Sequence, residues 1–272
     1  MVGAQLTEVV LFSSSSFLIF DVDEIDGNES DEEEISFMYQ YPDATHQLME
    51  RLTQTIIEYL VLQVNAGAQM LEVFDTQAGC LSPALWEEFV EPYLTRIATT
   101  VKKELKARGL EVVPMTVFPM GAHWALNSLS YSDYDVIAID WHTSPVWARS
   151  QVGDRVALQG NLDPSALFAD EKQLRKLVTE MAQQFGLTGT IANLGHGMLP
   201  SHTPDALYIF ADEIKTTCQS LSSSPFSSSI SSSSSLLTPA AFIASLSKNW
   251  AWVVGGMAAA LIAQRYSKAL RF

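Results

Sequence analysis

The sequence predicts an α/β protein built on a parallel sheet, and three observations lead to this fold class. Short apolar runs of strand length alternate with stretches of helical periodicity. Most of these runs lead into a polar turn and then into a helix start with a recognisable cap. This alternation is typical of parallel strands whose crossover helices cover the sheet. The predicted strands are residues 70–74, 112–118, 136–140, 155–160 and 190–195.

Helices are predicted where apolar residues recur at every fourth position. Leu48 to Leu60 show this spacing ahead of the first strand, and Leu85 to Val101 show it between the first two strands. The later connections are shorter, but they carry the same kind of pattern. The further predicted helices are residues 124–129, 145–150, 164–168, 171–185 and 204–220.

Helix starts are marked by a polar residue followed by proline. The side-chain oxygen of the first residue accepts from unpaired N–H groups, and proline lacks the N–H that would otherwise have no partner. Asp170 and Gln173 have the spacing of a capping box. The pairs of this kind are Ser82-Pro83, Ser144-Pro145, Asp163-Pro164 and Thr203-Pro204.

Two architectures are compatible with this order of elements, an open doubly wound sheet and a (β/α)8 barrel. The first usually carries a Gly-rich phosphate turn after its opening strand, and neither GxGxxG nor GxxxxGK[ST] occurs in this chain. Both architectures place their chemistry at the C-terminal ends of the strands. Because His123, His142 and His196 follow predicted strands, we expect a cleft at this end of the sheet.

Charge and cysteine content exclude several classes of function. The net charge is −15, yet residues 1–50 hold 12 of the 31 acidic residues and none of the 16 basic ones. The rest of the chain is nearly neutral, which argues against nucleic-acid binding, because such binding needs an excess of lysine and arginine on one surface. Cys80 and Cys218 form no CxxC motif and no close pair, so we expect no disulfide framework, no thiolate zinc site and a reducing compartment.

Four segments resemble uroporphyrinogen decarboxylases: YLVLQVNAGAQMLEVFDTQAGCLSP, DYDVIAIDWHTSP, VALQGNLDPSALFA and IANLGHGMLPSHTPD. GNLDP and NLGHG, which come after predicted strands, are the most specific parts of this likeness. The resemblance implies a (β/α)8 TIM-type barrel, a homodimer, no cofactor and a cytoplasmic or plastid location. It also implies a carboxy-lyase that removes the carboxyl groups of the four acetate side chains of uroporphyrinogen III, giving coproporphyrinogen III in haem biosynthesis.

The resemblance also assigns roles to individual residues. His196 in NLGHG takes the place of a histidine that contacts the substrate, and Thr76 in VFDTQAG that of a serine that hydrogen-bonds a substrate carboxylate. Phe74 matches a phenylalanine that lines the cleft. No metal ligand is implied. The other matching positions, where backbone shape is the expected reason, are Asp140, Gly160, Asn161, Asp163 and Gly195.

The beginning of the chain departs from the family pattern. Family members start with barrel strands that supply an aspartate for the pyrrole N–H groups and arginines for substrate carboxylates, and nothing in residues 1–37 resembles these strands. Asp21, Asp23 and Asp26 lie in an acidic run, so the catalytic residue stays unassigned. Five strands instead of eight predict an N-terminally incomplete barrel of about five β/α units. We therefore expect this chain to bind porphyrinogen weakly and to turn it over little.

Two other functions stay open. The first is a truncated, non-catalytic pseudoenzyme or an interaction partner that pairs with complete subunits. The second is a cobalamin-linked methyltransferase of the same fold, which would need zinc ligands close together. Cys80 and Cys218 are far apart in the sequence and no HxC motif occurs, so this second alternative has little support.

Composition divides the chain into four segments. Residues 1–37 form an acidic segment predicted to be disordered, and residues 38–220 form the barrel domain. Residues 221–238 are a Ser-rich linker. Residues 239–272 are an apolar tail with basic flanks, interpreted as a candidate membrane helix or as a helix that docks on a partner. Membrane association through this tail is the alternative to a cytoplasmic location.

Overall fold

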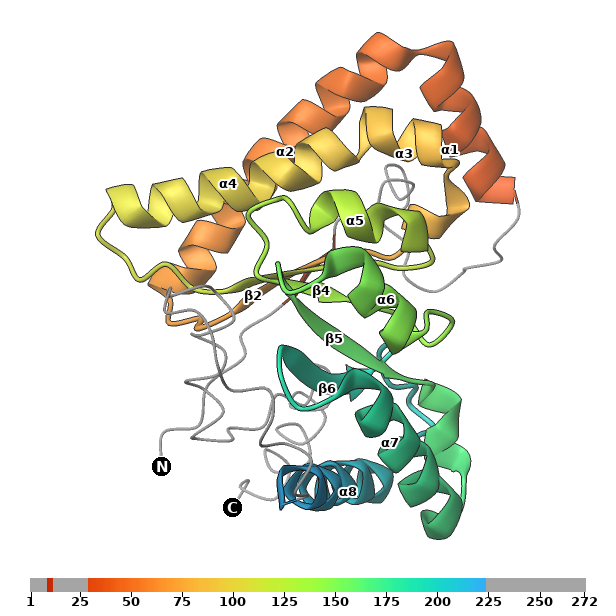
Figure 1. Ribbon diagram of the computed structural model, residues 1–272. Helices are drawn as coiled ribbons and strands as arrows, with labels where there is room; N and C mark the ends of the chain where they lie inside the picture. Colours follow the sequence, from red (N-terminus) through yellow and green to blue (C-terminus); the bar gives the residue numbers. More distant parts are fainter. Residues whose placement is uncertain (1–8, 12–28, 224–272) are drawn as a thin grey trace, which may run out of the picture. The chain divides into compact units, whose positions relative to one another are not determined.

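The computed structural model describes residues 9–11 and 29–223 (Figure 1). These residues belong to two compact units, one that extends to Ile137 and one that begins at Ala138. The boundary falls within strand β4 (Val136–Ala138). The units are called the N-terminal and the C-terminal unit below, and each is described by itself.

Parallel strands form the sheet of the N-terminal unit. Strand β1 (Val9–Leu11) pairs with β2 (Leu71–Asp75), and β2 pairs with β3 (Met115–Pro119) over its whole length. Strand β3 in turn pairs with the first residues of β4. All five residues of β3 are buried, as expected for a strand covered on both faces.

Helices α2 (Pro42–Asn65) and α4 (Glu91–Ala107) are the long helices of this unit, and they run beside each other in Figure 1. Each turns an apolar stripe inward, so that Leu60 and Leu94 are fully buried. The remaining helical elements are α1 (Glu29–Gln40), α3 (Pro83–Phe89), α5 (Leu126–Leu129) and the 3-10 turns η1 (Ala78–Cys80) and η2 (His123–Ala125).

The C-terminal unit contains the parallel pair β5 (Ala157–Leu162) and β6 (Thr190–Leu194). Ile139, directly after β4, donates its N–H to Gln159 O of β5 at 2.9 Å. Helices α7 (Glu171–Phe185) and α8 (Pro204–Ser223) pack beside each other (Figure 1). The other helical elements are α6 (Pro145–Val152) and the 3-10 turn η3 (Pro164–Phe168).

The predicted fold class is confirmed. All five predicted strands are present with boundaries shifted by a few residues, and every strand pair given above is parallel. The predicted caps of α3 and α6 are formed, because Ser82 Oγ accepts from Leu85 N and Ser144 Oγ from Trp147 N. Asp170 Oδ1 accepts from Gln173 N at 2.8 Å and caps α7.

The acidic N-terminal segment is more structured than the sequence predicted. Disorder was expected through residue 37, but α1 begins at Glu29 and β1 lies within the same segment. Residues 221–223 extend α8 into the predicted linker.

No helix within residues 29–223 is long and apolar enough to cross a membrane. The predicted tail at 239–272 and nearly all of the predicted linker lie outside the described residues.

Candidate functional site

The candidate region of the N-terminal unit is the C-terminal end of β2. Phe74 is half-buried and meets the Phe118 ring of β3 edge-on, with ring centroids 5.7 Å apart. Thr76 follows the strand directly and is also half-buried. An aromatic side chain and a hydroxyl thus stand one residue apart on either side of Asp75, where the sheet ends.

Asp75 itself points into the interior and is fully buried. Its Oδ2 accepts a hydrogen bond from Trp86 Nε1 of α3 at 3.1 Å. Tyr134 is also fully buried, and burial, with a smaller contribution from the Asp75 carboxylate, raises the pKa of its phenol. Tyr134 therefore stays protonated and donates to Leu94 O at 3.1 Å. This buried network holds the strand end on which Thr76 is placed.

Two loops are joined next to Thr76 by a close approach of glycines. Gly79 N donates to Met120 O at 2.9 Å, and Met120 N donates to Asp75 O at 3.1 Å. A Cβ on Gly79 would lie 2.8 Å from the Gly121 Cα, closer than side-chain carbons come to backbone atoms. Glycine at both positions therefore lets the loops after β2 and β3 touch.

A separate strand-end region, in the C-terminal unit, is the turn that follows β4. Asp140 is nearly completely buried, and its Oδ1 accepts from His142 N at 2.9 Å and from Thr143 Oγ1 at 3.1 Å. Asn161 of β5 donates its Nδ2 to Asp140 O and to Thr143 O, each at 2.7 Å. The turn is thus fixed by its own carboxylate and by the next strand.

Two glycines give the same region its backbone shape. Gly160 has φ +137°, and a Cβ there would lie 2.6 Å from Ile139 O. A Cβ on Gly195, directly after β6, would lie 2.6 Å from Trp141 N. Asp163 Oδ1 accepts from Ser165 N at 2.8 Å and caps η3. The structure therefore gives each of these three residues a local packing or capping reason.

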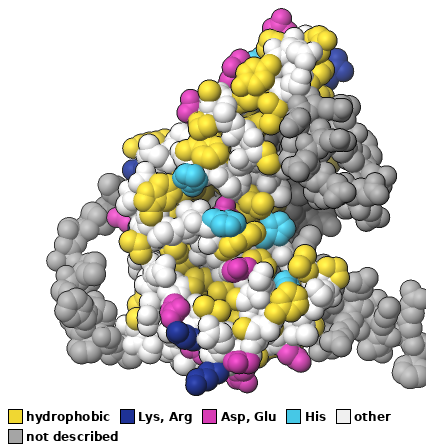
Figure 2. Space-filling model, turned by 90° about the vertical axis from the view of Figure 1, so that its right-hand side faces the viewer, with side chains coloured by type: hydrophobic (Ala, Val, Ile, Leu, Met, Phe, Trp, Pro, Cys, Tyr) yellow, Lys and Arg dark blue, Asp and Glu magenta, His cyan; other side chains and the backbone are white. Residues whose placement is uncertain are grey.

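His196 follows Gly195 and is exposed. Its ring meets the Trp141 indole edge-on, with centroids 6.3 Å apart, and its Nδ1 lies 3.4 Å from Gly197 O. Histidine side chains are visible at the surface in Figure 2, which agrees with the exposed position of His196.

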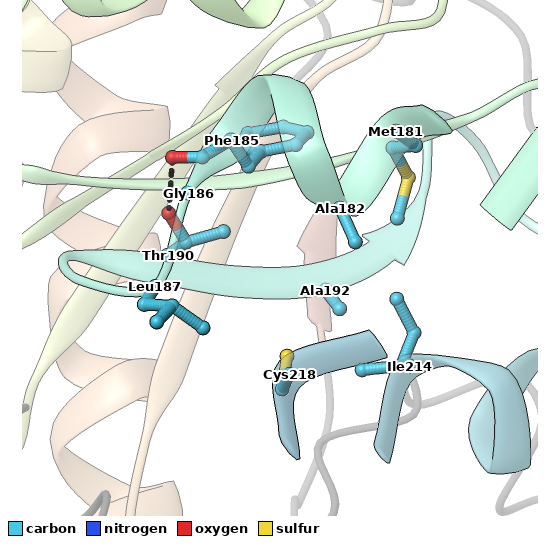
Figure 3. A pocket seen from close by; sticks show the side chains of 9 residues that line it. All are labelled: Met181, Ala182, Phe185, Gly186, Leu187, Thr190, Ala192, Ile214 and Cys218. Atoms are coloured by element: carbon cyan, nitrogen blue, oxygen red, sulfur yellow. Dashed lines mark hydrogen bonds between the residues drawn. The ribbon is translucent and has the colours of Figure 1, made fainter. Parts of the chain in front are cut away.

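A pocket of about 40 Å³ also lies in the C-terminal unit, between α7, β6 and α8 (Figure 3). It has room for a few water molecules but not for a tetrapyrrole. Burial raises the pKa of its one thiol, Cys218, so this sulfur is a poor nucleophile. None of the predicted site residues lines the pocket, whose lining residues are Met181, Ala182, Phe185, Gly186, Leu187, Thr190, Ala192, Ile214 and Cys218.

The three predicted binding residues fall in different units. Phe74 and Thr76 belong to the N-terminal unit and lie together at one strand end, whereas His196 belongs to the C-terminal unit. The sequence interpretation gave no role to Asp75 or to Trp141, although both stand where a strand ends, which is the signal that could have identified them. Among the side chains that the structure describes, no three histidine, cysteine, aspartate or glutamate residues could together hold a metal ion.

Comparison with known proteins places the chain in a family. A family model described as uroporphyrinogen decarboxylase (URO-D) matches residues 25–217. The chain belongs to the uroporphyrinogen decarboxylase family. Uroporphyrinogen decarboxylases of zebrafish (Danio rerio) and human (Homo sapiens) are each 44% identical to it over 178 residues, which are 65% of this chain and 48% of theirs. That of Salinibacter ruber is 48% identical over 178 residues and 49% of its length.

The chain thus spans about half the length of the uroporphyrinogen decarboxylases that it matches. Phe74, Thr76 and His196 all lie within the part that matches the family model. Among solved structures, a methyltransferase from Methanosarcina mazei has a TM-score of 0.56 at 16% identity, covering 67% of this chain and 52% of that one. At this identity the likeness concerns the fold alone, and it agrees with part of a barrel.

Proposed function

We propose that this domain takes part in the decarboxylation of uroporphyrinogen, in which the carboxyl groups of the four acetate side chains are removed to give coproporphyrinogen. The observation that carries the proposal is the family match over residues 25–217, which includes the hydroxyl of Thr76 and the imidazole of His196 after two parallel strands. Strand ends of this kind carry the chemistry of barrel enzymes.

The reaction asks two things of the protein. The pyrrole ring is protonated first, and the resulting cation accepts the electron pair that the departing CO2 leaves behind, so the protein must stabilise that cation. It must also hold several carboxylates. Thr76 Oγ1 and a ring nitrogen of His196 are hydrogen-bond donors suited to the second task. Phe74 offers an apolar surface for the macrocycle.

No residue of this chain is assigned to stabilising the pyrrole cation, since Asp21, Asp23 and Asp26 do not stand in the family's strand context. For the 272-residue chain by itself we therefore expect weak substrate binding and little turnover. A non-catalytic role, as a binding partner of complete subunits, is the alternative that this mismatch favours.

The family resemblance supplies the remaining parts of the proposal. We infer a homodimer in the cytoplasm that uses no cofactor, with membrane association through residues 239–272 as the alternative. Analytical ultracentrifugation would test the dimer, and membrane fractionation of the chain with and without residues 239–272 would test the location.

Binding and turnover of the purified 272-residue chain test the function directly. Uroporphyrin, the stable oxidised form of the substrate, is titrated while tryptophan fluorescence is recorded, and coproporphyrinogen is assayed separately. We expect measurable binding that Thr76→Val and His196→Leu, which each remove a donor, weaken about three- to tenfold, the usual net value of one hydrogen bond at an accessible position. Lys172→Gln, an exposed change on α7, is the control. Absence of binding by the wild-type chain would refute the proposal, and rapid turnover would refute the expected inactivity.

A further inference from the structure

An indole ring flanked by two histidines stands after β4 and β6 of the C-terminal unit. The centroid of Trp141 lies 4.8 Å from that of His142, with the planes tilted by 38°. It also lies 6.3 Å from the centroid of His196, which meets it at 87°. The three rings come from two strand ends that are far apart in the sequence, so their association is a product of the fold.

Buried polar groups hold the backbone segments that carry this cluster. The backbone of His142 donates to the buried Asp140 carboxylate, and Asn161 donates to the carbonyl groups of Asp140 and Thr143. Gly195, which precedes His196, packs against the backbone of Trp141. A Cβ on Gly195 would lie only 2.6 Å from Trp141 N. The backbone that carries the three rings is therefore held in place, as a preorganised binding site requires.

The same rings are open to solvent. The side chain of His142 is 77% exposed, His196 is exposed and Trp141 is half-exposed. His142 Nδ1 lies 4.0 Å from Asp140 Oδ1 and His196 Nδ1 lies near Gly197 O, whereas no partner lies on Nε2 of either ring among the described residues. Each Nε2 can therefore meet a ligand on the outer side of the indole.

Two arginines of this unit are engaged in structural hydrogen bonds and ion pairs. Arg149 donates to the carbonyl groups of Gly153, Val156 and Gly189. Arg175 pairs with three carboxylates of α7 and α8. Neither arginine is thus available to this strand-end region, whereas the two exposed imidazoles can donate to a carboxylate ligand.

We propose that Trp141, His142 and His196 form a subsite for one carboxylated pyrrole ring of the tetrapyrrole, with His142 binding a carboxylate in addition to the one that His196 contacts. The pyrrole lies against the exposed indole surface, and the imidazole N–H groups donate to its acidic side chains. This inference rests on the proposed function and adds His142 and Trp141 as residues that determine how the substrate is held.

Titration of the 272-residue chain with two porphyrins tests the subsite. Uroporphyrin presents eight carboxylates, and its octamethyl ester presents the same ring without charged groups in a common solvent mixture. We expect His142→Leu, which removes the N–H donor, to raise the dissociation constant for uroporphyrin about three- to tenfold, the usual net value of one hydrogen bond at an exposed position, and to change that for the ester much less. Trp141→Phe should weaken both, because it reduces the surface that contacts the ring.

Lys172→Gln, which removes an exposed amine from α7 of the same unit, is the matched control and should leave both constants unchanged. Circular dichroism of each variant checks the fold, which a change at so exposed a side chain as His142 should not disturb. Normal binding of uroporphyrin by His142→Leu, or an equal loss with the ester, overturns the subsite while the proposed function stands. Absence of porphyrin binding by the wild-type chain overturns both.

Discussion

The indole N–H of Trp86 donates to the carboxylate of Asp75 at 3.1 Å, and neither residue is exposed to solvent. A strand end is thereby tied to the first helix that follows it, directly beside Thr76. A carboxylate is costly to bury unless donors surround it, so this bond matters more for stability than one on the surface.

Trp86→Phe removes the donor but keeps an aromatic ring. We expect a loss of about 1–3 kcal/mol in the free energy of unfolding, the cost of withdrawing a partner from a buried polar group. Urea denaturation measures it, with Trp147→Phe as the control because Trp147 is 38% exposed. In a double-mutant cycle with Asp75→Asn, a coupling energy below about 0.5 kcal/mol would show that the two side chains act independently.

Gly195→Ala tests the close approach beneath Trp141. The added Cβ would stand 2.6 Å from Trp141 N, so the backbone must move, at a cost of about 1–3 kcal/mol. The substitution should also weaken porphyrin binding, because both flanking rings shift. The comparison is Gly109→Ala, where φ is +68° but no atom lies within 4 Å, so that only backbone strain is tested. Unchanged porphyrin binding by folded Gly195→Ala would contradict the prediction.

Glu213 links stability to pH. Burial by itself would raise the pKa of this carboxyl, but hydrogen bonds from Thr179, Arg175 and Thr217 outweigh it and leave the pKa lowered. A carboxylate whose folded pKa lies below its unfolded value of about 4.3 stabilises the fold above that value, and this contribution is lost as the pH falls through the folded pKa.

Glu213→Gln should therefore lower the free energy of unfolding by about 1–2 kcal/mol at pH 7, with a difference from wild type that shrinks below about pH 4. Glu180→Gln on α7, an exposed partner of Lys176 at 3.7 Å, is the control and should change little at either pH. Thermal melts at several pH values provide the measurement. A destabilisation that is independent of pH would mean that the charge of Glu213 is not involved.

The two cysteines should differ in reactivity. Cys80 is exposed, whereas burial in the pocket of Figure 3 raises the pKa of the Cys218 thiol and lowers its thiolate fraction at pH 8. In the folded chain, iodoacetamide should label Cys80 severalfold faster than Cys218. Peptide mass spectrometry measures the two labelling rates. In denaturant the two rates should converge. Equal rates in the folded chain would show that the pocket is open to the reagent.

The sequence by itself determined the order of strands and helices from α2 onward, the fold class and the family. Periodicity and cap residues identify elements because they depend on neighbours in the chain, as Asp170 and Gln173 at the start of α7 illustrate. The motifs GNLDP and NLGHG located Gly160, Asn161, Asp163, Gly195 and His196. The composition of residues 1–37 was misleading, since α1 starts at Glu29 in spite of the acidic run.

Only the tertiary structure decided what those residues touch. Asn161 donates to the turn at Asp140, Gly195 lies against Trp141 N, and Asp75 accepts from Trp86. Each of these contacts joins two different elements of the fold. Such contacts depend on the register between neighbouring strands and on the distance between two backbones. Local periodicity in the sequence encodes neither of them. The cluster of Trp141 with His142 and His196 follows from the same alignment.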